Sequence, residues 1–362
     1  MAEPNLSNAR IEAERVRFCG DIAPPRRQPL SLNTTMARDD LYQQAVEVSP
    51  LMTPNLWKSY QNVCARLEIP LSSSSVFIYS SRDVQGECLS GEPGGCVIRL
   101  SSGLVDLLEE DEFEFVVGHE LGHFLLDHGS LGLRDSSTIV YLRNRRAQEI
   151  SVDRIGLVAC GSLNAALRAL MKTASGLTDR HLRFDVRAFI AQLKKIEREE
   201  NTSDWSGSTH PSILIRAKAL LWFSLSDYFV GGRISYSREQ MRKIDERIER
   251  DLQKFIDGAV TRRIDVLKRD LLLWMTTLEM VRSGVFSIQV QSRMKAHFGD
   301  EAVDKLRGFL ADLTKMEAEQ VTFERLKSAR VELERLIPDG LLQEVRQLET
   351  IALQLVGDDQ RQ

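Results

Sequence analysis

The feature that most constrains this chain is the apolar run at 116–124, which contains the pattern His-Glu-x-x-His. Residues four apart lie on one face of a helix, so His119 and His123 can reach the same metal ion. Glu120 lies one residue round from that pair, where its carboxylate can take a proton from a water on the ion without binding the ion itself. The alternative is a core helix with two buried, hydrogen-bonded histidines. The run therefore predicts a buried helix, and the pattern favours a metal site on it.

The third ligand is expected on the next helix. A catalytic zinc site has three protein ligands and a water. The longer pattern His-Glu-x-x-His-x-x-Gly-x-x-His is not present, because Gly129 stands where its last histidine would be. The helical pattern at 137–160 places Glu149 and Asp153 on one face, four residues apart. We expect Glu149 to bind the metal and Asp153 to fix the tautomer of a ligand histidine. The competing interpretation is a solvated helix face that pairs with neighbouring arginines.

Composition and charge exclude several classes of protein. The 362 residues are 43% hydrophobic and 28% charged, with a net charge of −4, which gives no reason to expect nucleic-acid binding. No apolar stretch approaches the ~20 residues needed to cross a bilayer, so no transmembrane segment is expected. Residues 1–17 lack the apolar core of a signal peptide. The five cysteines are scattered without a Cys-x-x-Cys pattern, which predicts reduced thiols in a cytoplasmic protein.

Three regions are expected along the chain. Residues 1–38 have a polar, proline-rich pattern and predict an N-terminal arm. Residues 39–230 alternate helical patterns with two short strands around a glycine-rich stretch, and a small sheet beside a buried metal helix fits a zinc-peptidase lobe. From the glycine pair at 231–232 onward nearly every segment has a helical pattern, which predicts an all-α C-terminal domain at 231–362. The predicted fold class is therefore α+β and mostly helical.

Three motifs resemble those of the M48 zinc metallopeptidases, a family within the gluzincins. They are His119-Glu120-Leu121-Gly122-His123, then Glu149-x-x-x-Asp153, then Ser208-Thr209-His210-Pro211-Ser212 followed by Arg216. The resemblance covers residues 40–225 and implies an endopeptidase that acts on proteins or peptides and holds one zinc ion per chain. It implies that His119, His123 and Glu149 bind the zinc and that Glu120 acts as general base toward a metal-activated water.

The resemblance also implies roles for residues around the metal. His210 of the His-Pro motif is expected to stabilise the tetrahedral oxyanion, and Arg216 to support the oxyanion or the substrate. Family members usually carry Asn-Ala on the strand that pairs with the substrate backbone, whereas the equivalent stretch at 86–91 reads Gly-Glu-Cys-Leu-Ser-Gly. The membrane-embedded members have several transmembrane helices, and the lack of such a pattern here is typical of a soluble, cytosolic branch.

Two hypotheses about activity follow. The first is an active zinc endopeptidase, which the presence of Glu120 favours. The second is a helical interaction protein with a structural or regulatory zinc site, whose C-terminal helices bind a protein partner. Cys19 bears on both, because a thiolate in a displaceable arm is a good zinc ligand and would restrain the site. The alternative for Cys19 is an incidental thiol with no role at the metal.

Overall fold

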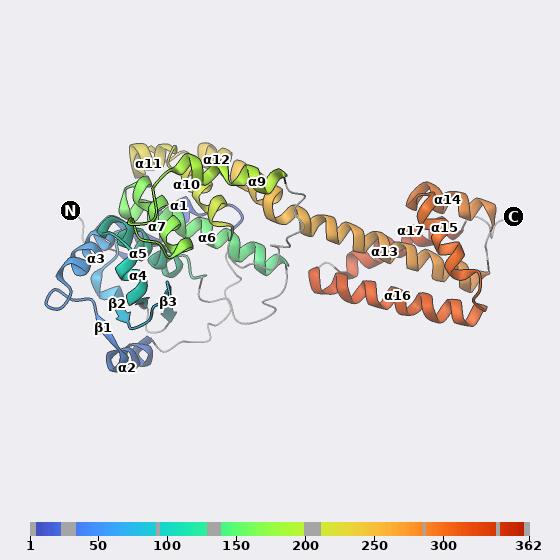
Figure 1. Ribbon diagram of the computed structural model, residues 1–362, viewed down its shortest axis with the longest axis horizontal. Coiled ribbons are helices and arrows are strands. Elements are labelled where there is room, and N and C mark those ends of the chain that lie inside the picture. The colour runs from blue at the N-terminus through green and yellow to red at the C-terminus, as the bar shows by residue number, and fades with distance from the viewer. Residues whose placement is uncertain are drawn as a thin grey trace. The chain divides into compact units, whose positions relative to one another are not determined.

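The protein is described by a computed structural model. Its described residues are 5–22, 34–91, 95–128, 139–198, 211–284, 287–337 and 341–357. The chain divides into two compact units, the first made of residues 1–136 and 142–256 and the second of residues 137–141 and 257–362. Helices dominate both units, and a small mixed sheet lies in the first. The mostly helical α+β class expected from the sequence is confirmed (Figure 1).

A four-stranded sheet forms one layer of the first unit. Its strands are β1 (Ala45–Glu47), β2 (Ser74–Tyr79), β3 (Gly86–Gly91) and β4 (Gly95–Ser101), in the order β1-β2-β4-β3. The central pair, β2 and β4, is parallel, and the two outer pairs are antiparallel. Among the described residues β3 is therefore an edge strand, and the backbone groups on its outer side are available to another chain.

Strand register turns one face of the sheet toward a buried helix of the first unit. Gly86 pairs with Leu100, and Cys88 pairs with Ile98. Directly paired residues point to the same side of a sheet, and Leu100 and Ile98 are fully buried in the core of the first unit. The side chain of Cys88 and the bare face of Gly86 therefore look inward, toward helix α5 (Glu110–Leu125).

Helix α5 lies between the sheet and helices α6 (Ile139–Cys160) and α7 (Leu163–Ser175) (Figure 1). Glycines permit its close approach to α6. A methyl group on Gly118 would lie 3.1 Å from the Cα atom of Gly156, and one on Gly122 would lie 3.0 Å from Cγ1 of Val152. Both contacts are tighter than most real side chains make, and a Cβ on Gly118 would also overlap Cβ of Ala159. The lack of a side chain therefore lets the two helices come together, with Glu149 of α6 opposite His119 and His123 of α5.

Further helices cover the first unit. They are α1 (Leu6–Val16), α2 (Thr34–Gln44), α3 (Pro54–Leu67), α4 (Ser102–Leu107), α8 (Val186–Ala191), α9 (Leu193–Arg198), α10 (Ile213–Phe223), α11 (Asp227–Gly231) and α12 (Arg238–Leu252), with short turns of helix at Leu71–Ser73 and Arg233–Ser235. The described part of the expected N-terminal arm does not stand apart from this body. Ala9, Ala13 and Val16 of α1 are buried in the core of the first unit.

The division between the units falls later than the boundary expected at 231–232. Helix α12 packs on α10, and its residues Met241, Ile244 and Ile248 belong to the core of the first unit. The glycine pair ends a helix at that point without ending the hydrophobic core. Burial of the apolar face of α12 therefore carries the first unit on to residue 256.

The second unit has a helical core of its own. After a π-helical turn at Gln253–Asp257, its helices are α13 (Gly258–Ser283), α14 (Ile288–Phe298), α15 (Asp300–Leu310), α16 (Lys315–Leu336) and α17 (Leu341–Val356). Helix α13 packs against α16 and α17. The fully buried residues of the second unit include Leu271 of α13, Val290 of α14 and Leu333 of α16. Across the described parts of both units, every helix is too short or too polar to cross a membrane.

Candidate metal centre

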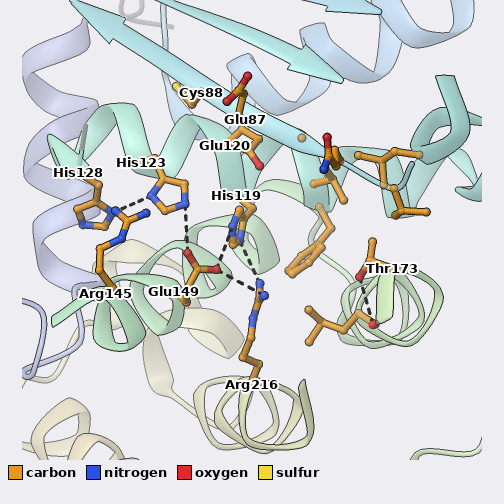
Figure 2. Close-up of a pocket in the computed structure, with 17 residues that line it drawn as sticks. Glu87, Cys88, His119, Glu120, His123, His128, Arg145, Glu149, Thr173 and Arg216 are labelled. Carbon is orange, nitrogen blue, oxygen red and sulfur yellow. Dashed lines mark hydrogen bonds and ion pairs between the residues drawn. The ribbon is translucent and has the colours of Figure 1, made fainter. Parts of the chain in front are cut away.

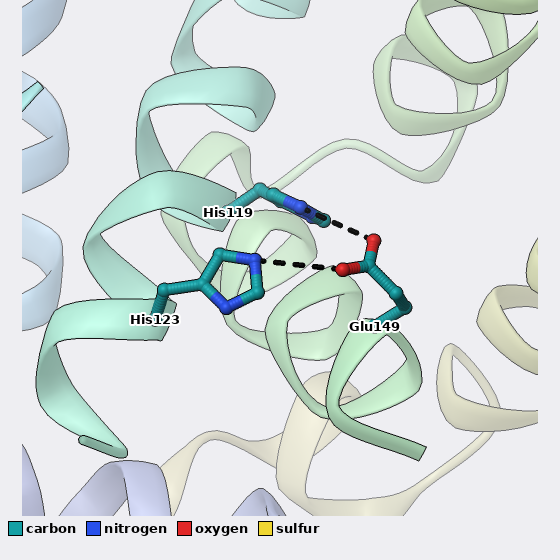
Figure 3. A group of neighbouring side chains, drawn as sticks. All are labelled: His119, His123 and Glu149. Carbon is teal, nitrogen blue, oxygen red and sulfur yellow. Dashed lines mark ion pairs between the residues drawn. The ribbon is translucent and has the colours of Figure 1, made fainter. Parts of the chain in front are cut away.

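Three side chains from two helices form a cluster suited to a metal ion. His119 and His123 project from α5 and Glu149 projects from α6 (Figure 3). The Nε2 atom of His119 lies 3.6 Å from Oε2 of Glu149, and Nε2 of His123 lies 3.6 Å from Oε1 of the same carboxylate. One donor atom from each residue lies within 4.8 Å of the others. An ion bonded at about 2.0–2.2 Å to two imidazoles and a carboxylate fits that spacing, and this donor set is typical of catalytic zinc.

Glu120 lies next to the cluster and faces the same cavity (Figure 2). Its side chain is buried, and burial raises the pKa of the carboxyl group to about 7. A methyl group on Gly86 of the edge strand would lie 3.2 Å from Oε1 of Glu120. Glycine at position 86 thus leaves room above the carboxylate, and a carboxyl group with this pKa exchanges protons readily near neutral pH.

Asp153 contacts the Nδ1 atom of the His119 ring, and Arg216 in turn binds Asp153. Oδ1 of Asp153 lies 3.0 Å from Nδ1 of His119. Arg216 donates to both carboxylate oxygens of Asp153, at 2.7 and 2.6 Å, and its Nη1 lies 3.4 Å from Glu149. Burial alone would raise the pKa of Asp153, but the Arg216 charge and hydrogen bonds lower it overall. Asp153 is therefore a carboxylate that accepts the Nδ1 hydrogen of His119, which leaves Nε2 of that ring free for a metal.

His123 has a second support that the sequence did not reveal. Its Nδ1 atom lies 2.9 Å from Nδ1 of His128, and Nε2 of His128 lies 3.0 Å from Oδ2 of Asp21. His128 and Asp21 are both buried, at 2% and 4% exposure. The sequence feature that could have pointed to His128 is a third histidine, five residues after His123. Asp21 had no signal, because it lies in the N-terminal segment and far from the motifs in sequence.

A cavity of about 570 Å³ opens over the ligands. Its lining includes residues 84–88 at the start of the edge strand, so β3 borders the site (Figure 2). Arg145 and His128 lie beyond His123 on one side, and Thr173 lies on the opposite side past His119. The apolar lining residues are Val84, Leu104, Phe115, Val116 and Leu170.

Most of the residues selected from the sequence meet at this cavity. His119, Glu120, His123, Glu149 and Arg216 all line it, and Asp153 contacts His119 behind it. Arg216 is engaged with two carboxylates, which favours a role in holding the ligands over the expected role at an oxyanion. The structure thus brings the two histidines, the glutamate and Asp153 together, and their roles stay predictions.

Two selected residues are not part of this arrangement. His210 lies outside the described residues, so its expected role at an oxyanion stays a prediction. Cys19 does not line the cavity, and its backbone N–H donates to Asp245 of α12 at 3.1 Å. Partial burial and the neighbouring Asp245 carboxylate raise the pKa of the Cys19 thiol to about 11. The position of Cys19 outside the lining of the cavity thus favours an incidental thiol over a zinc ligand.

Comparison with known proteins identifies the region that carries the site. The profile of Peptidase family M48 matches residues 52–136, which include all of α5. Metalloprotease YcaL of Escherichia coli (strain K12) is 35% identical over 94 residues, which are 24% of this chain and 35% of that protein. A protease HtpX homolog of Nostoc sp. (strain PCC 7120 / SAG 25.82 / UTEX 2576) is 28% identical over 82 residues, 23% of this chain and 28% of that protein.

A third relative matches a longer stretch. The plastoglobule-localized metallopeptidase 48 of Arabidopsis thaliana is 25% identical over 159 residues, which are 36% of this chain and 46% of that protein. The chain thus spans less than half the length of each of these relatives. No solved structure matches it. The segment that matches Peptidase family M48 contains His119, Glu120 and His123, and the structure sets Glu149 of α6 against them, so this part of the chain is similar to the metallopeptidases of that family.

Proposed function

We propose that this protein is a zinc-dependent endopeptidase that holds one zinc ion on His119, His123 and Glu149. The observation that carries the proposal is the arrangement of those three donors and Glu120 around one cavity, beside an open strand edge. A structural zinc site is normally closed by four protein ligands. Here the described residues supply three, and a carboxylate that is not a ligand faces the same space. That arrangement suits catalysis better than the alternative of a purely structural or regulatory zinc site.

The chemistry follows from the positions of the side chains. A bound zinc ion would polarise a peptide carbonyl and make a water more acidic. Glu120 takes the proton of that water as general base and then passes it to the amine of the broken bond. Burial of Glu120 beside the three donors keeps the carboxyl group within reach of a water on the ion and shields it from bulk solvent. Asp153 and Arg216 keep His119 and Glu149 in place during the reaction.

Strand β3 is the proposed binding edge for the substrate. An extended peptide can add to an open sheet edge through backbone hydrogen bonds. Residues 86–88 border the cavity, so a peptide paired there would pass directly over the ligands and Glu120. Gly86 has no side chain to obstruct it, and Glu87 forms an ion pair with Arg99 of the neighbouring strand. The substrate class is therefore an unfolded protein segment or a peptide that can adopt an extended conformation.

The proposal also includes the other expectations from the sequence, which concern His210, the C-terminal helices, the cellular location and the domain limits. We propose that His210 stabilises the oxyanion and that the helices of the C-terminal domain bind a protein partner. A cytoplasmic location and the absence of a nucleic-acid partner fit the cysteine pattern and the net charge of −4. The domain limits proposed from the sequence are 1–38, 39–230 and 231–362, with the packing of α12 favouring a later second boundary.

A comparison of two proteins tests the proposed activity. Wild type and Glu120→Gln are incubated with casein and with a quenched fluorescent peptide, and the zinc content of each is measured. Wild type should cleave both substrates, and the variant should keep its zinc and its melting temperature but lose cleavage. A variant that cleaves as fast as wild type would refute the role of Glu120. Loss of zinc from the variant would show instead that Glu120 is a ligand.

A further inference from the structure

The second nitrogen of the His123 ring is buried against another histidine. Nδ1 of His123 lies 2.9 Å from Nδ1 of His128, and both rings are largely shielded from water. A ligand histidine needs a partner for the nitrogen that does not bind the metal, because that partner sets the tautomer and the angle of the ring. For His119 the partner is a carboxylate, Asp153. For His123 it is another imidazole, whose own orientation must be set by a further partner.

The positions of the hydrogens follow from the geometry. If Nε2 of His123 binds the metal, the hydrogen of that ring is on Nδ1 and must be donated to His128. Nδ1 of His128 then accepts, so the hydrogen of His128 is on Nε2, which lies 3.0 Å from Oδ2 of Asp21. A doubly protonated His128 would set two N–H donors against each other. One arrangement therefore satisfies all three residues: His123 donates to His128, and His128 donates to the Asp21 carboxylate.

Asp21 is held in place by the segment around it. Its side chain is fully shielded and lies 3.6 Å from the Nε atom of Arg17, and its backbone N–H donates to the carbonyl of Phe18. The same segment is fastened to both ligand-bearing helices. Arg17 donates to the carbonyl of Leu126 at the end of α5, and the Phe18 N–H donates to Ser151 of α6 at 3.0 Å. The carboxylate is thus fixed relative to the proposed metal ligands by hydrogen bonds between side chains and backbone groups of its neighbours.

We propose that Asp21 is a positioning residue of the metal centre, which acts through His128 to fix the tautomer and orientation of His123. The N-terminal segment then completes the zinc site, in contrast to the hypothesis from the sequence that Cys19 of the same segment restrains it. The matched family region, residues 52–136, contains His128 but not Asp21, so the carboxylate comes from outside that region. This inference rests on the proposed zinc binding by His119, His123 and Glu149.

Zinc affinity measured in full-length variants tests the proposal. Asp21→Asn keeps the shape of the side chain and removes its charge, and Asp21→Ala removes the hydrogen bond as well. Arg10→Ala is the matched control, because it removes an exposed ion pair between the same segment and Asp127 without contacting His128. Zinc affinity is measured by competition with a chromophoric chelator. The melting temperature is measured for each protein after chelator treatment and again after zinc is restored.

The expected result is a loss of zinc affinity that follows the hydrogen-bond chain. Direct partners of ligand histidines change metal affinity about 10–100-fold, and Asp21 acts one link further away. Asp21→Ala should therefore bind zinc on the order of tenfold more weakly, and Asp21→Asn severalfold more weakly. Both should show a smaller rise in melting temperature on zinc addition, because that rise reports the affinity for zinc. Arg10→Ala should match wild type in both respects.

Two different failures are distinguishable. If the Asp21 variants melt earlier without zinc but bind zinc as tightly as wild type, Asp21 only holds the segment and the positioning role is wrong. If wild type itself binds no zinc, or His119→Ala binds it equally well, the proposed function fails and the inference fails with it.

Discussion

Replacing Asp153 with asparagine tests how the ligands are held. The side chain keeps its size, but the charge that balances Arg216 and accepts the His119 hydrogen is lost. The loss of a carboxylate behind a ligand histidine typically weakens metal binding about 10–100-fold. That factor corresponds to about 1.4–2.7 kcal/mol of zinc binding free energy.

The metal-free protein should lose stability as well. Removing one partner of a buried ion pair costs about 3–5 kcal/mol, because the other charge stays buried. The side chain of Arg216 is 13% exposed and keeps a contact with Glu149 at 3.4 Å, so we expect the lower end, about 3 kcal/mol. Urea unfolding of chelator-treated protein measures this loss, and chelator competition measures the loss of zinc affinity.

A matched control separates this site from an ordinary ion pair. Asp251→Asn breaks a 2.6 Å contact with Lys218, which belongs to α10 like Arg216 but faces away from the metal cluster. This pair is partly exposed, so its loss should cost no more than about 1 kcal/mol and leave zinc affinity unchanged. Wild-type zinc affinity in Asp153→Asn would refute the argument that Asp153 fixes the tautomer of His119.

Four further predictions concern the chemistry and the segment near it. Glu120→Gln should lower the cleavage rate by at least ~10²–10⁴ while zinc content stays the same, since it loses the general base. His210→Ala should lower kcat by ~10²–10³ at unchanged zinc content if His210 stabilises the oxyanion, and loss of zinc would make it a ligand instead. The pKa of Glu120 is about 7 in the folded protein and near 4.3 when unfolded, so the folded state binds the extra proton between those values. The contribution of Glu120 to the stability of the metal-free protein should therefore fall as pH rises across that window, so wild type should lose stability relative to Glu120→Gln over the same range in thermal melting. Cys19→Ser should match wild type in zinc content and cleavage rate, and a faster variant would revive a restraining role for the thiol.

The cluster of His119, His123 and Glu149 could be proposed from the sequence because helix geometry links spacing along the chain to position in space. His119 and His123 lie one turn apart on α5, so they share a face of that helix. Glu149 and Asp153 share a face of α6 for the same reason. What the sequence left open was whether the two helices face each other. The close approach at Gly118 and Gly156 settles that, and it depends on tertiary packing.

The hydrogen bonds from His123 through His128 to Asp21 could not be predicted either, because they also depend on tertiary packing. Asp21 is 107 residues from His128 in the sequence, and neither residue has a spacing relationship with the other. The N-terminal segment looked like an arm because prolines follow it, yet Val16 and Phe18 are buried in the core. The glycines at 231–232 mark the end of a helix, whereas the packing of the apolar face of α12 on the first unit could not be read from the sequence.

A zinc titration of chelator-treated protein tests the central claim most directly. The rate of cleavage of a quenched peptide is followed as zinc is added, beside an Asp251→Asn control that keeps the metal cluster intact. The account predicts almost no activity without zinc, a linear rise, and a plateau at one equivalent per chain, with no rise in Glu149→Ala over the same range. Activity that is indifferent to zinc, or that returns fully in Glu149→Ala at one equivalent, would contradict the assignment of His119, His123 and Glu149 as the ligands of a catalytic ion.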